Sequence, residues 1–134
     1  MRKDNWPRII SEEIKNHKNV PFVWGEKDCC LAVADIMIAY TGVDFAAEFR
    51  GKYTTARGSV MALKRYGKGS LKETLDAKFP SIEIAEAGRG DIGLVKTEGG
   101  ESMAIIFSNI AWAMNNEGLV DLPMSSLICA WRVE

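Results

Sequence analysis

The chain has 134 residues, of which 47% are hydrophobic and 26% are charged, and this composition predicts one globular domain, residues 1–134, with its own core. The formal net charge is −1 with both signs interspersed, which is not typical of proteins that bind nucleic acid or an anionic membrane. No apolar run approaches the roughly 18 residues of a membrane span, and Met1–Ile10 contain no apolar signal segment, so we expect synthesis in the cytoplasm.

Helices are predicted first along the chain. Pro7 starts an amphipathic helix that ends at the Asn16–Asn19 stretch. A second helix is predicted over residues 31–40, where Asp35 is the one charged residue. A helix that is apolar on nearly all sides is typical of the middle of a domain. We therefore expect the rest of the chain to pack around residues 31–40.

The start of this central helix carries the first candidate for chemistry. Asp28 is a good N-cap, because its carboxylate can accept hydrogen bonds from free N–H groups of the first turn. Cys29 is then expected on that first turn, where the aligned peptide dipoles favour a thiolate. Thr41-Gly42 is a common end for such a helix.

Two shorter helices and then a sheet are predicted. Thr54 or Thr55 caps a helix that stops at Gly67, and Ser70 caps another that ends before Pro80. The residues of the first that we expect to face inward are Val60, Met61 and Leu63. Short apolar or alternating runs follow, separated by turn residues, at 82–85, 92–95, 103–107, 110–114, 119–122 and 127–133. Helices first and strands second predict an α+β fold with an antiparallel sheet.

The three cysteines predict free thiols. Cys29 and Cys30 are adjacent, neighbours on a helix point in different directions, and an odd number leaves one cysteine over. We expect Cys30 and Cys129 to pack in the core. One histidine and no Cys-x-x-Cys leave a zinc site short of ligands, so we expect no metal and no cofactor.

Two motifs carry a resemblance to a known family. Trp24-Gly25-x-x-Asp28-Cys29 precedes the central helix, and Gly90-Asp91 precedes the sheet. Together they resemble the NlpC-type cysteine peptidases and amidases, a papain-like group that cuts peptidoglycan stem peptides. The resemblance implies a papain-like (NlpC-type) fold, with Cys29 at the start of a helix packed on an antiparallel sheet. It also implies that Cys29 stands at the position of the nucleophile.

A second resemblance covers residues from about 20 to the C-terminus. Thr41-Gly42-x-Asp44-x-Ala46-Ala47-x-x-Arg50-Gly51-x-Tyr53-x-Thr55 and the terminal Ala130-Trp131-Arg132 resemble small phage and prophage proteins of unassigned activity, which are encoded among tail genes. This resemblance implies other phage tail proteins as partners. It also implies a location in the tail of the virion after synthesis in the cytoplasm of a bacterial host.

The sequence departs from the peptidases at the base. Ser102 stands where they carry the catalytic histidine, and a serine hydroxyl cannot take up a proton near neutral pH. An orienting group on the next strand, Asn115 or Asn116, would have no imidazole to orient. His17 is the one histidine and could serve as base, since triads occur in different chain orders. The alternative, which we favour, is an exposed His17 near a helix C-terminus.

Three functions remain open from the sequence. The first is a non-catalytic tail protein, at the tail tip, which acts through protein–protein contacts. The second is a tail-associated cysteine peptidase or amidase with Cys29 as nucleophile, nearby backbone N–H groups as oxyanion donors, and His17 as the first candidate base. The third is a module that binds the peptidoglycan stem peptide without cutting it. The missing histidine favours the first.

Overall fold

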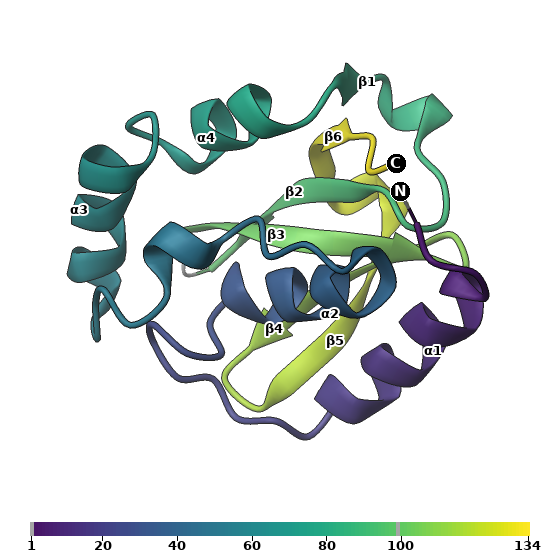
Figure 1. Ribbon diagram of the computed structural model, residues 1–134, viewed down its shortest axis with the longest axis horizontal. Helices are drawn as coiled ribbons and strands as arrows, with labels where there is room; N and C mark the ends of the chain where they lie inside the picture. Colours follow the sequence, from purple (N-terminus) through teal and green to yellow (C-terminus); the bar gives the residue numbers. More distant parts are fainter. Residues whose placement is uncertain (1, 99) are drawn as a thin grey trace.

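The computed structural model describes residues 2–98 and 100–134, and it has an α+β architecture (Figure 1). The helices are α1 (Trp6–His17), α2 (Leu31–Thr41), α3 (Ala56–Tyr66) and α4 (Leu71–Lys78). The strands are β1 (Ser81–Ile82), β2 (Ile92–Thr97), β3 (Gly100–Phe107), β4 (Ile110–Asn115), β5 (Gly118–Pro123) and β6 (Leu127–Trp131). Short 3-10 turns are η1 (Ala47–Phe49), η2 (Ile84–Glu86) and η3 (Met124–Ser126). The α+β class predicted from the sequence is confirmed.

The six strands form one antiparallel sheet in the order β1-β6-β2-β3-β4-β5. Strands β2 to β5 follow one another as hairpins, and β6 returns to lie between β1 and β2. The register pairs of β3 with β4 run only over Ile105–Phe107, whereas β3 pairs with β2 along its length from Gly100. The backbone at the beginning of β3, before Ile105, is therefore not paired with β4.

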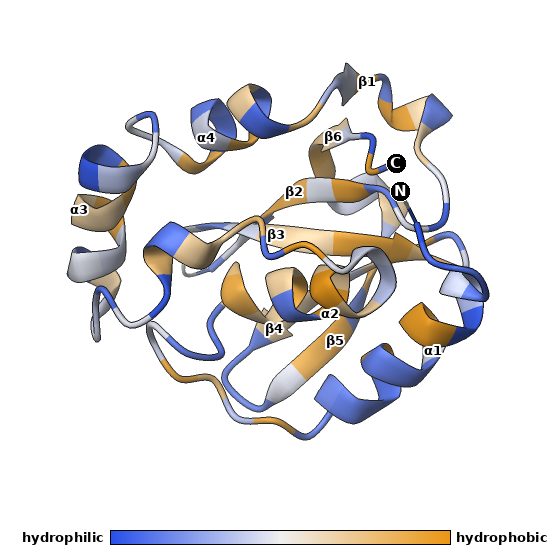
Figure 2. Cartoon of the chain, in the orientation of Figure 1, coloured by the Kyte–Doolittle hydropathy of each residue, from blue (hydrophilic) through white to orange (hydrophobic). Residues whose placement is uncertain are grey.

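Helix α2 is buried against this sheet, as its sequence predicts. Ile36 and Met37 on α2 belong to one apolar cluster with Met103 and Ile105 on β3. Figure 2 shows hydrophobic residues on α2 and along β3. Asp35, the one charged residue of α2, forms ion pairs with Lys27 and Arg50 at its edge.

The opposite face of the sheet is covered by turns rather than by helices. Val95, Ala104 and Ile106 form a second apolar cluster there, and residues of η2 and η3 pack against it. Within the described ranges, no helix combines the length and the hydropathy that a membrane span requires.

Two predictions of local structure are wrong. Val60 and Met61 on α3 are 50% and 58% exposed, because α3 lies at the periphery and only Ala62 and Leu63 reach the small cluster around Leu31. The first predicted strand is only the two-residue β1, because the chain turns into η2 at Ile84. The caps at Thr55 and Ser70 are confirmed, since each side chain accepts the N–H three residues on.

Candidate functional site

The candidate site is organised by Asp28, whose carboxylate is 1% exposed. One oxygen accepts the N–H groups of Cys30 at 3.0 Å and Leu31 at 2.9 Å. The other accepts the N–H of Gly25 at 3.0 Å and the hydroxyl of Tyr53. Four donors therefore fix the turn before α2. The carboxylate of Asp28 accepts N–H groups at the helix start as predicted, but the N-cap position itself is Cys30 and not Asp28.

Gly25 has a strict structural role in this turn. Its φ of 81° lies in the left-handed region, and a Cβ added to it would lie 2.0 Å from the carbonyl oxygen of Tyr53. Its own carbonyl accepts the N–H of Gly51 at 3.1 Å. The Trp24-Gly25 motif thus lets the loop around Tyr53 close onto the start of α2.

Cys29 and Cys30 lie just before α2 and not on its first full turn. The helix begins at Leu31, with Cys30 at the N-cap position. The two sulfur atoms are 3.8 Å apart, so the prediction that neighbouring cysteines point apart is wrong. The expectation assumed that both residues lie on the helix, whereas α2 begins only at Leu31.

The two thiols have opposite pKa shifts. The Cys30 thiol donates a hydrogen bond that lowers the pKa of Cys29, and burial and the negative charge of Asp28 oppose this effect. The same hydrogen bond, together with burial, raises the pKa of Cys30 well above its usual range. The pKa of Cys29 is therefore lowered and that of Cys30 is raised by the contact between the two thiols.

Ser102 lies beside Cys29. It is buried on β3, donates a hydrogen bond to the carbonyl of Met103 at 3.0 Å, and its hydroxyl also helps to lower the pKa of Cys29. The structure thus brings Cys29 and Ser102 together from segments about seventy residues apart. The single hydroxyl proton of Ser102 is donated to the Met103 carbonyl in this structure, and a serine hydroxyl cannot accept a proton from the thiol near neutral pH.

His17 is part of a different set of contacts. It is buried at the end of α1, so the prediction of an exposed histidine is wrong, because the ring packs under the loop before α2. Its Nδ1 lies 2.8 Å from the carbonyl oxygen of Glu13, and its Nε2 lies 3.4 Å from Nζ of Lys27. Lys27 in turn pairs with Asp35. Among the described residues, no hydrogen bond joins His17 to Cys29.

The asparagines considered as orienting groups hold a turn. The side chain of Asn115 accepts the N–H groups of Glu117 at 2.9 Å and Gly118 at 3.1 Å. The backbone carbonyl of Asn116 accepts the N–H of Phe22 at 3.2 Å. Both therefore serve the β4–β5 connection and its contact with the loop before Trp24.

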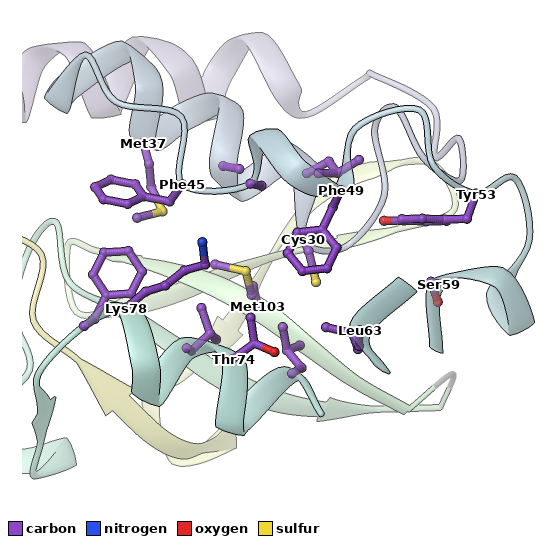
Figure 3. A pocket seen from close by; sticks show the side chains of 16 residues that line it. Cys30, Met37, Phe45, Phe49, Tyr53, Ser59, Leu63, Thr74, Lys78 and Met103 are labelled. Carbon is purple, nitrogen blue, oxygen red and sulfur yellow. The ribbon is translucent and has the colours of Figure 1, made fainter. Parts of the chain in front are cut away.

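An apolar cavity adjoins the site on the side of Cys30 (Figure 3). It lies between α2, η1, α3 and α4 and has a volume of about 60 Å³ for water-sized molecules. Its lining includes Cys30, Met37, Phe49, Leu63 and Met103. Sequence analysis missed this cavity, because it depends on how α3 and α4 sit over α2.

Tyr53 is a site residue whose role the sequence did not reveal. Its hydroxyl donates to Asp28, its ring lies edge-on to Trp24, and it lines one end of the cavity. Burial and the neighbouring Asp28 carboxylate raise the pKa of Tyr53, so it stays a neutral donor. The available signal was its place in the motif that ends at Thr55.

The side chains of Asp28, Cys29 and Cys30 form a group whose potential ligand atoms lie within 4.8 Å of one another. Both oxygens of Asp28 already accept two hydrogen bonds each. Only the two sulfur atoms are therefore available to a ligand without loss of the cap.

Comparisons place this geometry in a family. The fold is similar to the crystal structure of a Staphylococcus aureus subsp. aureus Mu50 protein described as similar to lipoprotein, NLP/P60 family, with a TM-score of 0.61 and 18% identity. The match covers 98% of this chain and 42% of that one, so this chain spans less than half the length of its neighbour, and the likeness concerns the fold alone. No curated protein matches the chain. A family model described as a domain of unknown function, DUF6950, matches residues 1–133, and the chain therefore belongs to that family.

Proposed function

We propose that this chain is a non-hydrolytic domain of papain-like, NlpC-type fold that serves as a small structural or assembly protein of a phage or prophage tail. The observation that carries the non-hydrolytic part is Ser102, whose side chain lies close enough to Cys29 to affect the pKa of its thiol. The family resemblance assigns this position to the histidine base of the peptidases, and a serine cannot replace it. The fold's similarity to an NLP/P60 family protein supports the papain-like part.

The absence of a base is supported by the contacts of the one histidine. A general base must reach the proton that it removes, directly or through one water. Both ring nitrogens of His17 already have partners, in the Glu13 carbonyl and the Lys27 ammonium. To act as the general base for Cys29, the His17 ring would have to give up its contacts with Glu13 and Lys27 and leave its buried position at the end of α1.

The tail assignment is supported by the motifs within residues 41–55 and 130–132, which resemble phage and prophage tail-region proteins. The exposed side of α3 adds a surface suited to protein contacts, since Val60 and Met61 lie there with Arg57 and Lys64. The proposed partners are other tail proteins, and the proposed location is the virion tail, at its tip.

Mass spectrometry of purified particles tests the location. Particles induced from a bacterium that encodes this chain are expected to contain it in their tail fraction, in a constant ratio to the major tail protein. Absence of the chain from purified tails would overturn the tail assignment and leave the non-hydrolytic assignment untouched.

A second candidate function is a cysteine peptidase or amidase acting on peptidoglycan, with Cys29 as nucleophile. The lowered pKa of Cys29 favours it, because a thiolate is the attacking species. The N–H groups of Cys30 and Leu31 are held by Asp28, so this function would need other oxyanion donors than these two.

Incubation with peptidoglycan and with synthetic stem peptides distinguishes these functions. We expect no cleavage by the natural chain, and cleavage that is lost in Cys29→Ala would overturn the proposal. If His17→Ala then kept the activity, His17 would be excluded as base. Binding of the stem peptide without cleavage, measured by calorimetry, would instead assign a binding module.

Ser102→His provides the sharpest variant, because it returns an imidazole to the side of Cys29. We expect faster alkylation of Cys29 near neutral pH than in the natural chain, since an adjacent imidazolium stabilises a thiolate. Ser102→Ala is the matched control, and circular dichroism checks that the larger side chain is accommodated. Equal alkylation rates in the two folded variants would mean that Ser102 does not occupy a base position.

A further inference from the structure

The adjacent thiols of Cys29 and Cys30 form a pair that none of the functions above uses. Their sulfur atoms are 3.8 Å apart, and both side chains are half-buried rather than enclosed. The structure therefore holds two soft donor atoms side by side at the start of α2.

The spacing of these atoms is that of metal ligands. In a tetrahedral site with zinc–sulfur bonds of about 2.3 Å, two thiolate ligands lie about 3.8 Å apart, because the bonds meet at about 109°. A disulfide requires a separation of about 2.05 Å. The observed separation of 3.8 Å therefore matches the distance between two thiolate ligands of one ion.

We propose that Cys29 and Cys30 together form a two-thiolate binding site for a soft divalent ion with a filled d shell, of the class of Zn²⁺ and Cd²⁺. Two thiolates neutralise the charge of such an ion, so a half-buried site would hold no uncompensated charge. This site is independent of the proposed function and has no need of a substrate.

The surroundings of the pair suit this role. Asp28 holds the backbone of Cys30 through the N–H group, which fixes the direction of one ligand from outside the coordination shell. The hydroxyl of Ser102 lies beside Cys29, and Met103 lines the same cavity as Cys30. The other two positions of a four-coordinate ion would be taken by water, or by water and a third donor near Ser102 and Met103.

Binding exchanges two protons for one ion. Each thiol loses its proton, two metal–sulfur bonds form, and two protons go to the solvent, with no change of oxidation state. Because the Cys29 thiolate becomes a ligand, the bound ion would also protect both cysteines from alkylation. The two effects, proton release and joint protection, are specific to a paired site.

Titration of the reduced full chain with Cd²⁺ tests the proposal. We expect one ion per chain, an ultraviolet absorption from cadmium–thiolate bonds, and protection of Cys29 and Cys30 together in alkylation followed by mass spectrometry. Cys30→Ser is expected to weaken binding at least about tenfold, which corresponds to about 1.4 kcal/mol, because one of two thiolate ligands is lost. Cys29→Ser is expected to do the same.

Cys129→Ser is the matched control, because Cys129 lies on β6 and is not part of the hydrogen-bonded pair of thiols. It is expected to bind Cd²⁺ as the natural chain does. The proposal is overturned if Cys129→Ser abolishes binding, or if either serine variant of the pair keeps the affinity and stoichiometry of the natural chain.

Discussion

Asp28 and Asp91 are two buried carboxylates that the fold satisfies in different ways. They are 1% and 3% exposed, so each needs partners in place of water. Asp28 accepts three backbone N–H groups and the hydroxyl of Tyr53, and within residues 2–98 and 100–134 it forms no ion pair. Asp91 accepts the N–H groups of Gly88 and Val133 and also pairs with two guanidinium groups, of Arg2 at 3.1 Å and of Arg132 at 3.7 Å.

This difference in partners gives the two carboxylates different roles: Asp91 serves the fold, and Asp28 also affects the candidate site. The Asp91 charge is neutralised, and its contacts join the segment before β2 to both ends of the described chain. The Asp28 charge is held by dipoles alone, and it raises the pKa of the neighbouring Cys29 against the stronger effect of Cys30. The Asp91 carboxylate therefore holds chain segments together, whereas the Asp28 carboxylate also changes the pKa of the Cys29 thiol.

The largest effect is expected for Asp91→Ala. Removing one partner of a buried ion pair costs about 3–5 kcal/mol, because the remaining charge loses its compensation. Urea denaturation should give a loss of this size in the free energy of unfolding. Glu12→Ala is the control, since Glu12 pairs with Arg8 on the exposed side of α1 and should change stability by at most about 0.5 kcal/mol. If Asp91→Ala lowered the free energy of unfolding by less than about 1 kcal/mol, the claim that Asp91 and Asp28 have different roles would be wrong.

A smaller loss is expected for Asp28→Ala. The N–H groups before α2 lose their acceptor, which costs about 2–3 kcal/mol, but no cation is left without a partner. The same urea measurement compares the variant with Asp91→Ala. If Asp28→Ala proved the more destabilising of the two, backbone donors would matter more at this site than a guanidinium does at Asp91.

Tyr53→Phe should cost less again. It removes one of four donors to Asp28, and a hydrogen bond to a charged group contributes about 1.5 kcal/mol. The control is Tyr66→Phe on α3, where the side chain is 39% exposed and a change within about 0.5 kcal/mol is expected. Equal losses in the two variants would show that the Tyr53 hydroxyl adds nothing to the cap.

The smallest expected effect comes from the negative charge of Asp28 rather than from its hydrogen bonds, and it is an effect on the pKa of Cys29. Asp28→Asn removes the negative charge beside Cys29, so the pKa of Cys29 should fall further and alkylation should become fast at lower pH. Mass spectrometry against pH measures each cysteine, and Cys129 serves as an internal control because burial raises its pKa. Asp91→Asn should leave the Cys29 profile unchanged. A Cys29 profile that coincided with that of Cys129 in the natural chain would contradict the lowered pKa.

The central helix and the sheet could be predicted from the sequence because their patterns are local. Residues 31–40 are apolar on nearly all sides, and the structure buries α2 as that pattern requires. The outward position of Val60 and Met61 could not be predicted, because the pattern marks an apolar stripe without stating whether anything covers it. Which side chains of α3 are covered depends on where this helix lies against the rest of the fold, and the local sequence pattern does not contain that information.

The candidate site could be predicted in part. Asp28 and Cys29 are marked by the helix start, and Ser102 by its place in the second strand after Gly90-Asp91. The contact between Cys29 and Cys30 could not be predicted, because the pattern did not show that the helix begins only after both cysteines, at Leu31. The burial of His17 depends likewise on a loop more than ten residues away.

The position of β6 has a consequence for how the chain folds during synthesis. Strands β2 to β5 can pair as hairpins as soon as they leave the ribosome, but β1 and one edge of β2 wait for Leu127–Trp131, which follow all of them in the sequence. Until then β2 presents an open edge, which is a template for pairing with other chains. A chain interrupted before β6 should therefore aggregate rather than persist as a soluble intermediate, and completion of the sheet marks the end of the vulnerable period.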